Sequence, residues 1–331
     1  MKYHQSVLLL FLFFLSSSVV EASLIPAPDP SSEFIRLKDR DLTAEFCAEW
    51  NPDFAFQGGK CCGRKASWKY RKRGVRCTPS RAKKSFCDEM TQNQISYISW
   101  IKQNKGKVDL LKLISSEMDQ LGTQAQCSPH DGFLSWGRPI LSTSDNRVKL
   151  RRPDRCVNFG TDRLVAMVEW VGRKVHEKYT SNEFSKVHLL VGDVSAPRGG
   201  CLAGKGGKVG HASHMTGQDV DLGFLIAQKN QSSPNEFTRR FYSKENWWLL
   251  KQVLNNPFVC VKKVFLDQRY IRRLRKVASK DSDWFKYKHL IQHSRGHRNH
   301  FHIRVGEGLG ATDCLDLKEN QWVSHPPKKQ S

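Results

Sequence analysis

The chain has 331 residues, of which 54 are Lys or Arg and only 32 are Asp or Glu, so its formal net charge at pH 7 is +22. This balance excludes a disordered acidic protein. It favours attraction to polyanions such as nucleic acid, anionic lipid or an anionic cell wall. A chain of this length can hold two domains, or one domain with a sizeable extension.

The N-terminal residues 1–22 have the pattern of a secretory signal peptide. Lys2 precedes an apolar run from Val7 to Leu15, and small residues then lead to a cleavage site after Ala22. The run is too short to cross a bilayer as a helix, and no later stretch is apolar enough, so no membrane span is expected. An uncleaved anchor is the alternative. We expect a secreted protein located in the periplasm, with an extracellular location as the alternative.

Residues 23–135 are expected to form a separate N-terminal region of unknown role. The chain has ten cysteines, an even number that predicts disulfide bonds in a secreted protein. Many of them lie in this region, together with a basic run from Lys60 to Lys84 that has eleven Lys or Arg residues and no acidic residue. Residues 45–90, which are dense in cysteine, glycine and basic residues, are expected to depend on disulfides more than on a hydrophobic core. The run either grips an anionic glycan wall or nucleic acid, or is only a solvated face.

Apolar periodicity predicts the secondary structure of the remainder. Helices are expected at 95–101, 108–121, 164–175 and 247–254, and strands at 186–191, 219–226, 261–266 and 300–305. Strands mixed with helices, without regular alternation, indicate an α+β fold. We expect a small, mainly antiparallel sheet flanked by helices in a domain spanning 136–315, followed by a tail at 316–331.

Two short clusters of histidine and aspartate contain the candidate functional residues, one at 210–221 and one at 297–302. The second cluster is His297-Arg298-Asn299-His300-Phe301-His302. On a strand, His300 and His302 point to the same side of the sheet, about 7 Å apart. One of them can then bind a metal while the other reaches a water molecule beside it. A lone His-x-His is more often an ordinary pair of histidines, but His297 and the other cluster favour a site.

The first cluster runs from Gly210 to Asp221, with His214 and Asp221 separated by six residues. His211 and Asp219 are further candidates, and Asp219 shares a strand face with Asp221, so that one can ligate while the other orients an imidazole. Imidazole and carboxylate suit zinc, and a catalytic zinc takes three protein ligands and keeps one position for water. For this segment alone, a polar turn bounded by glycines is the alternative.

Together the clusters resemble the penicillin-insensitive murein endopeptidases, within a wider group of zinc peptidases that includes the D-Ala-D-Ala dipeptidases and L-alanyl-D-glutamate peptidases. The wider pattern of His, six residues, Asp and a later His-x-His is present as His214, Asp221 and His300-Phe301-His302. The closer pattern also fits: Gly192-Asp193, Pro197-Arg198-Gly199-Gly200, Gly210-His211-Ala212-Ser213-His214, Asp219-Val220-Asp221, Asp283-Trp284 and Gln292-His293. The resemblance covers roughly residues 160–308.

The resemblance implies a zinc site with the ligands His214, Asp221 and His302. It implies His300 as general base and later acid, with His211 and His297 as additional residues; a protonated His297 or His211 would stabilise the oxyanion. Family members can carry an Asp and a His between the clusters for a second metal. Residues 229–248 contain neither, so a second zinc is not expected there.

The implied activity is hydrolysis of amide bonds in peptidoglycan cross-links, at the D-alanyl-diaminopimelyl bond and without sensitivity to penicillin. The alternatives are a carboxypeptidase or L,D-endopeptidase with the same zinc chemistry, or a protein that binds the wall or nucleic acid and holds a structural metal or none. The peptidase interpretation predicts peptidoglycan and no nucleic acid as partner. A serine hydrolase using Ser213 is disfavoured because the Gly-x-Ser-x-Gly elbow is missing.

Overall fold

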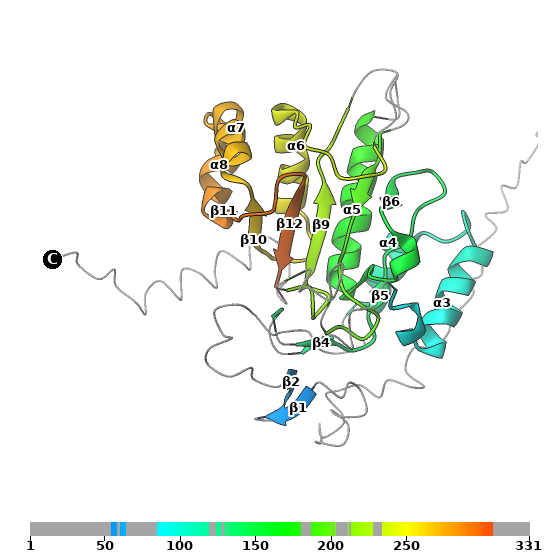
Figure 1. Cartoon of the computed structure of the whole chain (residues 1–331). Coiled ribbons are helices and arrows are strands. Elements are labelled where there is room, and N and C mark those ends of the chain that lie inside the picture. Colours follow the sequence, from blue (N-terminus) through cyan, green and yellow to red (C-terminus); the bar gives the residue numbers. More distant parts are fainter. Residues whose placement is uncertain are drawn as a thin grey trace, which may run out of the picture.

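A computed structural model describes residues 54–57, 60–63, 85–118, 124–126, 129–130, 132–179, 187–200, 202, 211, 213–227 and 234–306 (Figure 1). The predicted signal peptide, nearly all of the basic run at 60–84 and the tail at 316–331 lie outside these residues. The boundary at 135/136 between the two expected regions stays a prediction.

A six-stranded sheet forms the centre of the fold, with the strand order β11-β10-β12-β9-β8-β6 (Figure 1). The strands are β6 (Val148–Leu150), β8 (Leu189–Val191), β9 (Asp219–Gly223), β10 (Val261–Leu266), β11 (Ile291–His293) and β12 (His300–Val305). The three inner pairs are antiparallel, whereas β10–β11 and β6–β8 are parallel. The α+β class is thus confirmed, but the sheet is mixed. Helices separate β6 from β8 and β10 from β11 along the chain, which allows parallel pairing.

The predicted helices form close to their expected positions. They are α3 (Gln92–Gln103), α4 (Leu110–Glu117), α5 (Asp162–Tyr179) and α6 (Ser243–Leu254). Two helices not predicted from periodicity, α7 (Gln268–Ala278) and α8 (Ser282–Tyr287), follow β10. None of the helices in the described part of the chain combines the length and apolar character needed to cross a membrane.

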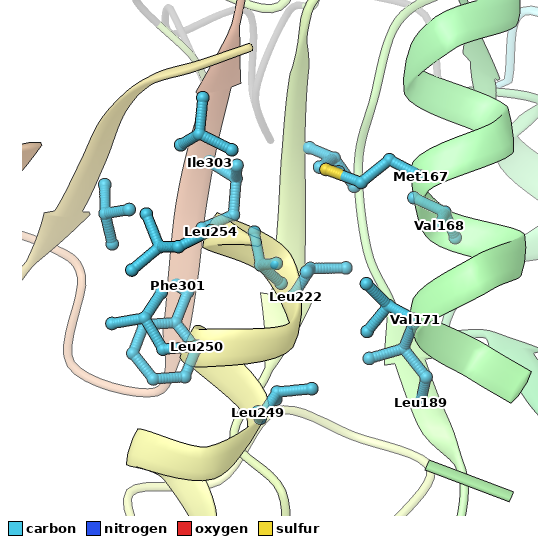
Figure 2. Packing of buried hydrophobic residues seen from close by; sticks show 14 of the residues in the cluster. Met167, Val168, Val171, Leu189, Leu222, Leu249, Leu250, Leu254, Phe301 and Ile303 are labelled. Carbon is cyan, nitrogen blue, oxygen red and sulfur yellow. The ribbon is translucent and has the colours of Figure 1, made fainter. Parts of the chain in front are cut away.

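The hydrophobic core lies between one face of the sheet and these helices. Figure 2 shows Phe301 and Ile303 of β12 beside α6, and Leu222 of β9 between α6 and α5. These side chains are almost completely buried. Successive residues of a strand point to opposite faces, so His300, His302 and Asp221 project from the other face of the sheet. The core therefore fixes β9 and β12 through one face of the sheet, and the opposite face remains available for the histidines and Asp221.

A buried arginine joins the N-terminal helices to α5. Arg138, in the short strand β5 (Arg138–Pro139), is fully buried and forms ion pairs with Asp162 at 2.8 Å and with Glu117 at 2.9 Å. It also donates a hydrogen bond to the hydroxyl of Tyr97 on α3. A buried charge needs such partners because its desolvation is costly. Asp162 begins α5, so this cluster ties α3 and α4 to the domain that contains the sheet.

Short elements surround the sheet. They are β1 (Phe54–Gln57) with β2 (Lys60–Gly63), β3 (Ala125–Gln126) with β4 (Phe133–Leu134), β5 with β7 (Phe159–Gly160), and the 3-10 turns η3 (Cys87–Glu89), η4 (Pro153–Arg155) and η6 (Lys288–Leu290). A disulfide joins Cys87 to Cys156, and Cys260 is also disulfide-bonded. Disulfide bonding is therefore confirmed for the described cysteines. The other seven lie where no side chain is described.

The buried carboxyl group of Glu169 on α5 is expected to make the stability of the fold depend on pH. This effect does not involve the histidines of the two clusters. Its side chain is 1% exposed, and Oε2 has no hydrogen-bond donor among the described residues. Burial raises the pKa of Glu169 to about 7, although Arg147 and Arg173 oppose this change. The carboxyl group therefore binds its proton more tightly in the folded than in the unfolded state. The resulting stabilisation is complete below the unfolded pKa and is lost as the pH rises through 7.

We expect Glu169→Gln to raise the free energy of unfolding at pH 8 by on the order of 3 kcal/mol, and by much less at pH 5. Urea unfolding at the two pH values measures this difference. Glu177→Gln is the matched control, because Glu177 lies on the same helix but is exposed and paired with Lys174. An equal effect of Glu169→Gln at both pH values would contradict the assignment.

Candidate metal centre

The register between β9 and β12 brings the two sequence clusters together. His302 lies directly opposite Asp221, and Arg304 lies opposite Asp219. Opposed residues of an antiparallel pair project to the same face of the sheet. Two of the predicted ligands are therefore set by strand pairing, although they are far apart in the sequence.

His214 reaches these residues from the loop before β9. Its backbone has φ = 73°, in the left-handed region that non-glycine residues rarely adopt. Two contacts hold it there: its backbone N–H donates to Asp219 Oδ2 at 3.0 Å, and Nδ1 lies 2.8 Å from the carbonyl oxygen of Val194. The side chain is also completely buried. A strained residue that is this strongly fixed is typical of a functional site.

Three donor atoms form a nearly equilateral triangle. His214 Nε2 lies 3.2 Å from His302 Nδ1 and 3.4 Å from Asp221 Oδ1, and the last two atoms are 3.3 Å apart. In a tetrahedral zinc site with bonds of 2.0–2.1 Å, two ligand atoms are about 3.3 Å apart. The triangle therefore matches one face of such a tetrahedron.

The outer atoms of the two imidazoles are held by the protein. Nδ1 of His214 faces the Val194 carbonyl, and Nε2 of His302 lies 3.0 Å from Asp219 Oδ1. Arg304 in turn donates to Asp219 at 2.7 Å. Metal-binding histidines usually have their second nitrogen fixed in this way by a carbonyl or carboxylate. Asp219 thus contacts the side of His302 that faces away from the triangle.

The electrostatics of the triangle also fit a cation. Asp221 Oδ1 is buried and has no hydrogen-bond donor among the described residues, although three imidazole nitrogens lie within 3.5 Å of it. Burial alone would raise the pKa of Asp221, but His300 and His214 hold it well below its usual value. A buried, ionised oxygen that lacks a donor is suited to a metal ion. His211, His214 and Asp221 also have ligand atoms within 4.8 Å of one another.

His300 borders the triangle, with Nε2 3.5 Å from Asp221 Oδ1. Its Nδ1 lies 2.8 Å from Asn299 Oδ1, and its ring stacks on Phe237 at a centroid distance of 4.9 Å. Burial lowers the pKa of His300 despite the opposing effect of Asp221. The imidazole is therefore neutral near pH 7 and has a free lone pair on Nε2 when Nδ1 donates to Asn299.

His297 and His211 are adjacent to different histidines of the cluster. The His297 ring centroid is 5.1 Å from that of His300, whereas the His211 ring is 4.5 Å from that of His214. Burial, His302 and His300 lower the pKa of His297 to about 4, which disfavours the protonated form that the sequence interpretation allowed for it. His211 Nε2 instead lies 2.9 Å from Asp193 Oδ2.

Sequence reasoning placed Asp193 in the family pattern, but it missed the contact of Asp193 with His211 and missed Arg155 altogether. Asp193 accepts a hydrogen bond from Arg155 at 2.7 Å, and its pKa is lowered to about 2, because His211 and Arg155 outweigh the effect of burial. Nothing in the pattern around Arg155 indicated this contact, which joins segments 38 residues apart. Arg304 was detectable, because it continues the two-residue spacing of His300 and His302. All the predicted site residues thus gather at one place, with their roles still to be assigned.

Comparisons with known proteins identify the family of this chain. Residues 130–324, more than half of the chain, match the family model described as penicillin-insensitive murein endopeptidase. This chain belongs to the penicillin-insensitive murein endopeptidase family. Both sequence clusters and the strands that carry them lie inside the matched region.

Family members with this description are distant relatives of the chain. The protein of Klebsiella pneumoniae strain 342 is 26% identical over 195 residues, which cover 54% of this chain and 65% of the relative. That of Haemophilus influenzae is 27% identical over 203 residues, covering 56% of this chain and 63% of the relative. Both are named penicillin-insensitive murein endopeptidase. The matched region spans less than two thirds of either relative.

Proposed function

We propose that the protein is a secreted zinc endopeptidase that hydrolyses amide bonds in the peptide cross-links of peptidoglycan, in the periplasm or outside the cell. The main support for this proposal is the triangle formed by His214 Nε2, His302 Nδ1 and Asp221 Oδ1. Its edges have the lengths expected between ligand atoms of a tetrahedral zinc site. The names of the relatives support peptidoglycan as the substrate.

His214, Asp221 and His302 would hold the metal, with Asp219 and the Val194 carbonyl fixing the two imidazoles. Zinc in such a site supplies a Lewis acid and lowers the pKa of a water molecule toward 7. The protein contributes the position of each ligand, which β9, β12 and the 213–218 loop hold. Such preorganisation reduces the entropy cost of assembling the reacting groups.

His300 would act as the general base. Its neutral imidazole is able to accept a proton from the attacking water and return it to the leaving amine. The stacked Phe237 and the contact with Asn299 limit the orientations of the ring. His211, held by Asp193, and His297 are the two flanking histidines able to donate a hydrogen bond to a negative oxygen.

Digestion of purified sacculi by the mature protein tests this proposal, with and without a zinc chelator and with muropeptides resolved by mass. Loss of cross-linked dimers and gain of monomers, abolished by chelator and restored by zinc, is the expected result. Product masses identify the D-alanyl-diaminopimelyl bond. Shortened stem peptides would indicate a carboxypeptidase instead, and intact dimers under all conditions would overturn the proposal in favour of a non-catalytic wall-binding protein.

The basic run from Lys60 to Lys84 is expected to anchor the protein to the wall. Replacing its Lys and Arg residues by glutamine should weaken sedimentation with sacculi, and the loss should be largest at low ionic strength, where surface charges are least screened. Pelleting across a salt series measures the effect. Unchanged binding at low salt would mean that the run is not an anchor.

A further inference from the structure

The helices α7 and α8 lie near the edge strand β11 (Figure 1). This part of the chain has a large excess of positive charge. Residues 262–298 include twelve Lys or Arg residues and three Asp residues. All three Asp residues have partners within the fold. Asp267 caps α7 and pairs with Arg298, Asp281 caps α8 and pairs with Lys251, and Asp283 accepts a hydrogen bond from the end of α6. The positive charge of this edge is therefore not balanced locally.

The outer side of α7 concentrates this charge. Arg272, Arg275 and Lys276 are exposed, and none has an ion-pair partner among the described residues. They are separated by three and four residues, so they share one side of the helix, where like charges repel and destabilise it. α7 itself contains no acidic residue. A bound anion would reduce this repulsion, whereas no neighbouring side chain among the described residues neutralises the three cations.

Exposed apolar side chains accompany the charge. Three large hydrophobic residues are exposed in the described part of the chain, and two of them are here: Val277, 38% exposed, at the end of α7, and Phe285, 60% exposed, on α8. Lys288 Nζ lies 5.2 Å from the centroid of the Phe285 ring. Cations around exposed apolar side chains are typical of surfaces that bind anionic membranes peripherally.

The packing of α7 determines the direction in which its charged outer side faces relative to the sheet. Its inner residues Tyr270, Leu274 and Ala278 belong to the core on the helical side of the sheet. Tyr270 contacts Phe224 at a ring distance of 5.0 Å, and Phe224 contacts Phe301 at 5.1 Å. The histidines of β12 project from the opposite face. The outer side of α7 and the candidate metal centre therefore face different directions.

We propose that the α7–α8 surface, defined by Arg272, Arg275, Lys276, Val277, Phe285 and Lys288, binds the anionic phospholipid headgroups of a membrane. The cations contact the headgroup phosphates, and Val277 and Phe285 enter the boundary of the acyl chains. An exposed aliphatic side chain gains from such insertion but adds little to phosphate contacts with a nucleic acid. The consequence for orientation rests on the proposed function: a protein bound by this surface presents its peptidase site away from the bilayer, toward the wall.

Sedimentation with vesicles of phosphatidylcholine containing increasing phosphatidylglycerol tests the proposal on the full mature chain. We expect the wild type to bind in proportion to phosphatidylglycerol, and Arg272→Gln/Arg275→Gln/Lys276→Gln to bind at least about tenfold more weakly. The matched control, Lys102→Gln/Lys105→Gln/Lys107→Gln, removes the same charge from exposed positions on and just after α3 and should bind nearly as the wild type. Val277→Ser/Phe285→Ser should reduce the binding that persists at high salt.

Three outcomes would overturn the proposal. They are absence of wild-type binding, equal losses in the α7 variant and its control, and a loss in the α7 variant that affects duplex DNA but not vesicles. Circular dichroism checks that the variants are folded, which is expected because glutamine is a good helix former and the replaced side chains are exposed. The vesicle assay involves no hydrolysis, and the α7 variant should digest soluble muropeptides as the wild type does. Failure of lipid binding and failure of the proposed activity are thus distinguishable.

Discussion

Replacing His214 or His302 with alanine is expected to remove zinc from the protein and to reduce peptidoglycan hydrolysis by at least about a thousandfold, because a site with two ligands neither retains the ion nor positions its water. Each histidine supplies one corner of a triangle with edges of 3.2–3.4 Å. Zinc content by elemental analysis and release of muropeptide monomers from sacculi measure the two losses.

Both imidazoles are buried, so the variants require a test of folding. Asp221→Asn keeps the shape of the third ligand and removes its charge, and should also weaken zinc binding without opening a cavity. His289→Ala, which changes an exposed histidine on η6 outside the cluster, should retain full zinc and activity. A His302→Ala protein that is folded and holds stoichiometric zinc would contradict the ligand assignment.

Replacing His300 with alanine is expected to separate metal binding from catalysis. The variant should retain zinc and lose at least about a hundredfold in kcat, the usual scale for loss of a general base. This expectation follows from the position of His300. Its Nε2 lies 3.5 Å from Asp221 Oδ1, beside the triangle of His214, His302 and Asp221 but not part of it. Elemental analysis together with steady-state hydrolysis of a defined cross-linked muropeptide measures both quantities.

Asn299→Ala is a graded comparison for this variant. It removes the side-chain contact to His300 Nδ1 but leaves the imidazole in place, so the loss in kcat should be smaller than in His300→Ala. If His300→Ala loses zinc as His302→Ala does, His300 is a ligand and not the base. If it keeps both zinc and activity, another group accepts the proton.

Local patterns in the sequence determined several parts of this protein correctly. The alternation in His300-Phe301-His302-Ile303 is the strand β12, with Phe301 and Ile303 in the core and both histidines on the other face. Apolar spacing likewise located α5 and α6. These predictions succeeded because the period of apolar residues depends only on which face of one element is buried.

The sequence did not predict α7. This helix has a narrow apolar side, Tyr270, Leu274 and Ala278, inside a run of cations. Its stability depends on packing against the core and on the cap from Asp267, and most helical stability in proteins comes from such tertiary contacts and not from propensity. The surface from which we infer membrane binding therefore became visible only in the fold.

The two sequence clusters also indicated which residues form the candidate site, and the family resemblance implied His214, Asp221 and His302 as its ligands. Only the tertiary structure decided how they meet: the β9–β12 register that sets His302 opposite Asp221, and the loop that turns His214 Nε2 toward both. The same holds for the Arg155–Asp193–His211 contacts, and for the parallel pairing of β6 with β8 and of β11 with β10 at the two edges of the sheet. These features join segments that are distant along the chain, and their geometry follows from how the elements pack, which no local period of residues specifies.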